Sequence, residues 1–75
     1  MDFGEALSRL KAGRSMCRAG WNGKGQFIAL QTPDENSKMG LPYLYISTVE
    51  GKLVPWLASQ TDLLANDWKY YKETK

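Results

Sequence analysis

The chain is poor in the residues from which catalytic and metal sites are most often built. Its 75 residues include one cysteine, Cys17, and no histidine. This composition excludes an internal disulfide, zinc sites made from Cys and His ligands, and catalysis that depends on histidine. We expect no metal and no cofactor. A lone free thiol fits a reducing compartment, so we expect a cytoplasmic protein.

Strong charge and long apolar segments are also missing. Ten Lys and Arg residues against eight Asp and Glu residues give a net charge of +2. This charge is too weak for a protein that binds duplex nucleic acid through a clustered basic stripe. No apolar run reaches the roughly 18 residues of a membrane span. The acidic, amphipathic start of the chain does not resemble a secretion signal.

The length predicts one small domain, residues 1–75, with a marginal core. A chain of this size buries only about 60% of the surface that its unfolded form exposes. Small domains without disulfides or metals often gain stability by self-association, so we expect a homo-oligomer. Aromatic residues, by contrast, are abundant: three Trp, four Tyr and two Phe. So many large rings indicate either a core or a platform for a planar ligand.

Apolar spacing predicts a helix over residues 2–12. The residues that share one face of this helix are Phe3, Ala6, Leu7 and Leu10. Asp2, followed by Glu5, is typical of a helix start, because carboxylates favour the positive end of the helix. Gly13 is placed to end the helix in the left-handed conformation.

Alternating side chains and turn residues predict about five strands, over residues 14–19, 26–31, 43–49, 52–54 and 68–71. Asn22-Gly23 predicts a hairpin between the first two, and residues 32–42 form a long polar loop. Ser59 or Thr61 can cap a short helix before the last strand. The expected fold class is α+β: an N-terminal helix, then an antiparallel sheet of about five strands with a short helical turn before the last strand.

The first candidate site is the segment Trp21-Asn22-Gly23-Lys24-Gly25. A tryptophan at a hairpin tip exposes a large ring, and glycines beside it let a ligand approach the backbone closely. Lys24 adds a positive charge for a phosphate group. The alternative is that Trp21 folds back onto the sheet and that the glycines serve only the turn.

The second candidate site spans residues 55–62 and brings together an aromatic ring, two hydroxyls, an amide and a carboxylate. Its members are Trp56, Ser59, Gln60, Thr61 and Asp62. Free amides at a helix start bind anions, and a carboxylate accepts hydrogen bonds from ribose hydroxyls or an exocyclic amine. The alternative for Ser59 and Thr61 is an ordinary helix cap.

Other residues receive structural interpretations. We expect Trp68 in the core, Cys17 as an inert buried thiol, and Arg18 as a solvent-exposed charge on a strand. No spacing among Glu50, Asp62 and Asp67 indicates a catalytic carboxylate pair, so an enzyme is poorly supported.

Two segments carry a resemblance to a known family. They are Gly-Trp-Asn-Gly-Lys-Gly at 20–25 and Val-Pro-Trp-Leu-Ala-Ser-Gln-Thr-Asp at 54–62. With the surrounding pattern, which runs from Phe3 to about Trp68, the sequence resembles small phage and prophage proteins that include the type-two Thoeris anti-defence proteins. Residues 32–41 match no pattern of that family.

The resemblance implies a homotetramer, a dimer of dimers, that sequesters cyclic ADP-ribose isomers made by bacterial immune sensors without degrading them. It places such a protein in the cytoplasm of the infected or lysogenic host. Some relatives also capture cyclic oligonucleotides at a separate site. The implied pockets lie between subunits, with Trp21 and Trp56 stacking on bases. The implied polar contacts come from Asn22, Gly23, Ser59, Gln60, Thr61 and Asp62.

Two other functions fit the composition. Aromatic residues on strands with scattered lysines are typical of a small β-rich module that binds single-stranded nucleic acid, although the low net charge argues against it. Alternatively, the tryptophans only build an interface in a structural or protein-interaction module.

Overall fold

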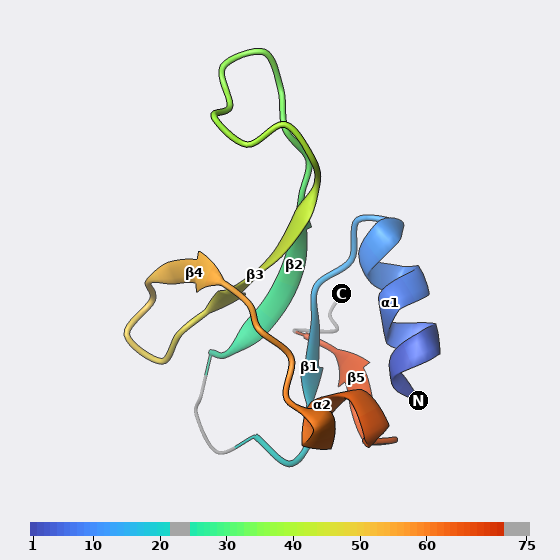
Figure 1. The fold of residues 1–75 in the computed structure, drawn as a ribbon. Helices are drawn as coiled ribbons and strands as arrows, with labels where there is room; N and C mark the ends of the chain where they lie inside the picture. The colour runs from blue at the N-terminus through green and yellow to red at the C-terminus, as the bar shows by residue number, and fades with distance from the viewer. Residues whose placement is uncertain (22–24, 72–75) are drawn as a thin grey trace.

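A computed structural model describes residues 1–21 and 25–71 of the chain. Figure 1 shows two helices and five strands in the order expected from the sequence. They are α1 (Phe3–Lys11), β1 (Met16–Arg18), β2 (Phe27–Gln31), β3 (Tyr43–Ser47), β4 (Leu53–Pro55), α2 (Gln60–Leu64) and β5 (Trp68–Tyr70). The predicted α+β class is confirmed, and most of the strands are one to three residues shorter than predicted.

All neighbouring strands pair antiparallel, in the order β4-β3-β2-β1-β5. The chain therefore leaves the sheet at one edge, after β4, and returns at the other edge as β5. The connection between these edges contains Trp56 and α2. Pro55 lies in the edge strand β4, where its missing N–H costs no sheet hydrogen bond.

Helix α1 begins and ends as the sequence predicts. The side chain of Asp2 accepts a hydrogen bond of 2.9 Å from the backbone N–H of Glu5, which satisfies one free amide of the first turn. Gly13 follows the helix with a φ of 96°, a conformation that favours glycine.

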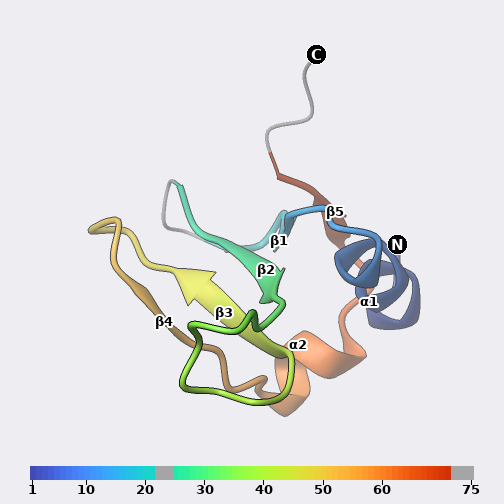
Figure 2. The same cartoon turned by 90° about the horizontal axis from the view of Figure 1, so that it is seen from above.

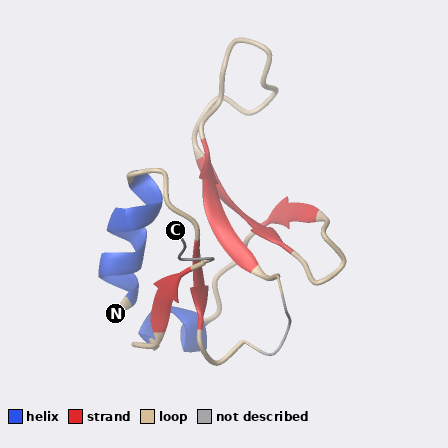
Figure 3. Ribbon diagram, turned by 180° about the vertical axis from the view of Figure 1, so that it is seen from behind, coloured by secondary structure: helices blue, strands red, loops and turns tan. Residues whose placement is uncertain are grey.

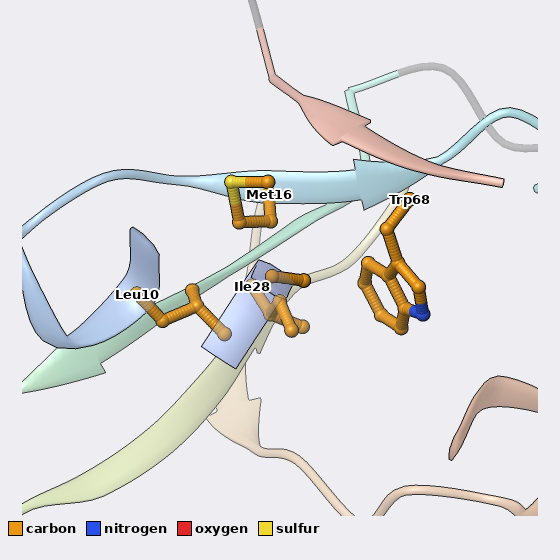
Figure 4. Packing of buried hydrophobic residues seen from close by; sticks show 5 residues of the cluster. Leu10, Met16, Ile28 and Trp68 are labelled. Carbon is orange, nitrogen blue, oxygen red and sulfur yellow. The ribbon is translucent and has the colours of Figure 1, made fainter. Parts of the chain in front are cut away.

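The core lies between α1 and one face of the sheet. One row of paired residues crosses all five strands on this face: Val54, Ile46, Ile28, Met16 and Tyr70. Leu10 of α1, Met16, Ile28 and Trp68 are fully or almost fully buried against one another, as Figure 4 shows. Burial of each such side chain contributes about 1.5–3 kcal/mol to folding. The predicted core position of Trp68 is confirmed.

The opposite face of the sheet has no described helix over it, because α1 and α2 lie on the same side (Figure 2). We call this surface the open face. It carries Phe27, Ala29, Tyr43, Tyr45 and Leu53. A shallow pocket of ≈ 80 Å³ forms between Tyr43, Tyr45, Leu53 and their neighbours. Within one chain, then, Tyr43 and Tyr45 on this face remain half-buried, and Ser47 is the buried residue of β3.

The loop of residues 32–42, between β2 and β3, extends beyond the rest of the molecule (Figure 3). Its turn is held by Asp34, whose carboxylate accepts from the backbone N–H of Asn36 and the hydroxyl of Ser37. Met39 and Leu41 are exposed. Neither of the two helices in the described part of the chain is long and apolar enough to cross a membrane.

Candidate functional site

The three tryptophans, far apart in the sequence, converge on the core side of the sheet. Trp68 is 2% exposed, and both Trp21 and Trp56 meet it edge to face, with ring centroids 5.5 Å and 6.0 Å away. Phe3 of α1 contacts Trp56 and Trp68. We call these four residues the aromatic cluster. Trp21 and Trp56 are half-buried, and both pack against the core at its margin.

Asp62, in the first turn of α2, holds two of these indoles. Its carboxylate Oδ1 accepts a hydrogen bond of 3.3 Å from Nε1 of Trp21, and its backbone carbonyl accepts one of 3.0 Å from Nε1 of Trp68. The hydroxyl of Ser59 accepts from the backbone N–H of Asp62 at 3.1 Å, which makes Ser59 the N-cap of α2. The cap of this helix therefore also places the carboxylate beside Trp21.

Arg18, at the end of β1, binds two carboxylates at once. Its Nη1 lies 2.8 Å from Oδ1 of Asp62, and its Nε lies 2.8 Å from Oδ1 of Asp67. Its Nη2 also donates to Oδ2 of Asp67 at 3.4 Å. We call Arg18, Asp62 and Asp67 the Arg18 clamp. It joins β1 to the first turn of α2 and to the residue before β5.

The prediction that Arg18 is a solvent-exposed charge is wrong. Its side chain is only 16% exposed, because Arg18 shares the core-facing side of β1 with Met16. A charge in that position requires partners, and the chain supplies Asp62 and Asp67. The alternation of side chains along β1 was the sequence signal for this position.

The prediction that Cys17 is buried is confirmed, and this burial raises the pKa of its thiol.

The backbone that leaves β1 is fixed by the same residues. The N–H of Ala19 donates to the backbone carbonyl of Asp67 at 3.0 Å. The N–H of Gly20 donates to Oδ2 of the same residue at 2.9 Å. The N–H of Trp21 donates to the carbonyl of Arg18 at 3.1 Å. A Cβ added to Gly20 would lie 3.0 Å from Oδ2 of Asp67, so this close approach favours glycine. Each backbone N–H from residue 19 to Trp21 is therefore hydrogen-bonded.

Both carboxylates of the clamp are ionised near neutral pH. Burial alone would raise the pKa of Asp62, but hydrogen bonds from Arg18, Trp21 and Ser59 outweigh it and lower that pKa. The hydrogen bond from Arg18, helped by the N–H of Gly20, lowers the pKa of Asp67. Two carboxylates and one guanidinium leave a net charge of −1, which favours hydrogen-bond donors over phosphate at this point.

The structure brings together part of the predicted site. Trp21 and Asp62 are in contact, and Trp56 joins them through Trp68. Gln60 and Thr61 are exposed in the first turn of α2. Asn22, Gly23 and Lys24 lie outside the described residues. Two further residues of the site, Arg18 and Asp67, were not among the predicted ones.

Comparison with known proteins identifies the family of this chain. The profile of the Tad2-like family, the Thoeris anti-defense 2-like domain, matches residues 1–71. A protein of Bacillus phage SP01 named "Thoeris anti-defense 2" is 40% identical over 81 residues, and the match covers 91% of each chain. The chain therefore belongs to the Thoeris anti-defense 2 family, a family of phage proteins that act against bacterial defence.

Proposed function

We propose that the protein captures an immune messenger of the cyclic ADP-ribose type and holds it without chemical change. It would act in this way in the cytoplasm of an infected or lysogenic bacterium. The family supports the anti-defence role. The observation that carries the proposal is the contact between the indole of half-buried Trp21 and the carboxylate of Asp62.

The surroundings of Trp21 and Trp56 suit a nucleotide with a purine base. Stacking of one base on an aromatic ring contributes about 1–3 kcal/mol. The two rings are held by Trp68 and Phe3, so little of this energy is spent on ordering them. The negative clamp favours the amino group of a base or a ribose hydroxyl near Asp62. Asn22, Gly23 and Lys24, which follow Trp21 in the sequence, are our candidates for the phosphate contacts.

Gln60 and Thr61 supply further polar groups on the exposed side of α2, and Ser59 contributes through its placement of Asp62. A cyclic oligonucleotide is a second messenger class that offers the same stacking surfaces. Its capture is an extension of the proposal, and the same experiment tests it.

A binding role suits the chemistry of this site better than catalysis. The chain has no histidine, and the pKa values of Asp62 and Asp67 are both lowered. Neither carboxyl group therefore holds a proton near pH 7, so neither serves as a general acid there. Asp62 already accepts hydrogen bonds from Arg18 and Trp21, which makes its carboxylate a poor base.

We further propose that the protein assembles as a homo-oligomer, a tetramer built from dimers. The open face of the sheet supports self-association, because a second chain would cover Tyr43, Tyr45 and Leu53. Leu57, before α2, and Leu64, the last residue of α2, are 92% and 83% exposed and offer apolar side chains outside the sheet. Two such surfaces on one chain suit two kinds of interface.

The test is capture followed by release. The protein is incubated with a cyclic ADP-ribose isomer, free ligand is removed, and the protein is denatured. We expect intact messenger in the released fraction, and cyclic dinucleotides are run in parallel. Trp21→Ala should retain little ligand, whereas Lys52→Ala, in the exposed turn before β4, should retain as much as the unchanged chain. Release of a hydrolysed product, or of no ligand, would contradict the proposal.

A further inference from the structure

We propose that Arg18 is a positioning residue, which fixes the ring of Trp21 for stacking through the carboxylate of Asp62. This inference deepens the proposed function and rests on it for the ligand. The guanidinium of Arg18 is occupied by Asp62 and Asp67. Its effect on the ligand would therefore be indirect.

The first step concerns the carboxylate of Asp62. The Trp21 Nε1 to Oδ1 distance of 3.3 Å is long for a hydrogen bond, whereas the Arg18 Nη1 to the same Oδ1 is 2.8 Å. The stronger, charge-assisted bond therefore decides where Oδ1 lies. Trp68 packs against the indole of Trp21, and the hydrogen bond to Oδ1 sets the direction of its N–H. The orientation of the ring therefore depends on Arg18 as well as on Trp68.

The second step concerns Arg18, whose guanidinium also binds Asp67. Asp67 accepts from Nε and Nη2 of Arg18 and also from the backbone N–H of Gly20. The planar guanidinium makes both contacts at once in a fixed geometry, which the single ammonium of a lysine does not reproduce. Asp67 thus fixes the orientation of the guanidinium, which in turn directs Nη1 toward Asp62.

The third step concerns the backbone of Trp21. Gly20, the residue before it, donates to the same Asp67 that holds Arg18. The main chain and the indole of Trp21 are therefore fixed by one connected network. A ring ordered in advance loses less freedom when a ligand stacks on it, which improves affinity without any new ligand contact.

A double-mutant cycle tests this inference. Arg18→Lys keeps the positive charge and removes the simultaneous contact with Asp62 and Asp67. Trp21→Phe keeps an aromatic ring and removes the N–H that donates to Asp62. With a cyclic ADP-ribose isomer as the probe, we expect Arg18→Lys to weaken binding by about tenfold in the unchanged chain and by less than about twofold in Trp21→Phe. Equal losses in both backgrounds would mean that Arg18 supports only the fold, and would overturn the inference.

A second measurement needs no ligand. The indole N–H signal of Trp21, assigned in an NMR spectrum by its loss in Trp21→Phe, reports the hydrogen bond to Asp62. We expect this signal to shift and to exchange faster with solvent in Arg18→Lys and in Asp67→Asn, while the signal of buried Trp68 stays protected. An unchanged Trp21 signal in both variants would overturn the inference. If the unchanged chain binds no messenger, the proposed function fails, and this spectrum still decides the role of Arg18.

Discussion

Trp21 and Asp62, separated by 41 positions in the sequence, meet through a hydrogen bond between an indole N–H and a carboxylate oxygen. Trp21 follows β1, and Asp62 belongs to α2, which lies in the connection from one edge of the sheet to the other. The two motifs thus come into contact only in the folded chain. The predictions below separate residues that hold this site together from residues that meet the ligand.

Replacement of two contacting tryptophans should have different consequences. Trp68→Ala removes the buried centre of the aromatic cluster and should cost about 3–5 kcal/mol of unfolding free energy. Trp21→Ala removes a half-buried ring and should leave a folded chain that no longer retains messenger. Urea unfolding and ligand retention, measured on the same samples, test the difference. A Trp21→Ala chain that binds normally would contradict the site.

Two glycines provide a matched pair. A Cβ at Gly20 would lie 3.0 Å from Oδ2 of Asp67, whereas a Cβ at Gly40 would meet nothing within 4 Å. We expect Gly20→Ala to lower the melting temperature and to weaken messenger binding, because Asp67 must move away from Arg18. Gly40→Ala should change stability by no more than about 1 kcal/mol. Equal melting temperatures for the two variants would contradict this account.

Acid should weaken the protein through the Arg18 clamp. The pKa values of Asp62 and Asp67 are lower in the folded protein than the value near 3.9 of an unfolded chain. The stability that they contribute is therefore present above about pH 5 and is lost as the pH falls through their folded values. Chemical unfolding between pH 7 and pH 2 measures it. Asp67→Asn should be less stable at pH 7 and should lose less stability in acid.

A charge on the open face should disrupt the proposed assembly. Tyr45→Glu places a carboxylate beside Ala29 and Pro55 in the middle of this apolar surface, and burial of that charge would be costly. We expect a smaller native mass for Tyr45→Glu, and an unchanged mass for Ser8→Glu on the exposed side of α1. An unchanged mass for both, with loss of binding to short single-stranded DNA in Tyr45→Glu, would instead favour the nucleic-acid module.

The two hydroxyls near the start of α2 should have different roles. Ser59 caps the helix, so Ser59→Ala should cost about 0.5–2 kcal/mol of unfolding free energy. Thr61 is exposed, so Thr61→Ala should leave stability within about 0.5 kcal/mol. We expect Thr61→Ala to reduce messenger retention without a change in melting temperature. Normal retention would remove Thr61 from the site.

Local pattern was sufficient to predict most of the fold. The cap by Asp2, the stop at Gly13 and the start of α2 depend on residues within a few positions of each other. For α2 the sequence left Ser59 and Thr61 open as caps, and the structure has Ser59. The strands followed from alternation, with ends shortened because a strand stops where its neighbour no longer pairs. Short-range spacing was therefore enough for the elements and their order.

The clamp was not predicted, because its partners lie far apart in the sequence. Arg18 meets Asp62 and Asp67 only because β5 pairs with β1 and not with β4. That pairing is a property of the whole sheet, which no short segment encodes. The alternation along β1 did place Arg18 on the side of Met16, and this was the observation that contradicted its assignment to solvent.

The edge-to-face contact of Trp21 with Trp68 makes the tryptophan fluorescence of the chain sensitive to the surroundings of Trp21. A heterocycle that stacks on Trp21 would quench its emission, while Trp68 and Trp56 respond through energy transfer over centroid distances of 5.5 Å and 6.0 Å. Capture of a messenger would therefore change the tryptophan fluorescence of the unlabelled protein, so that binding can be followed in real time.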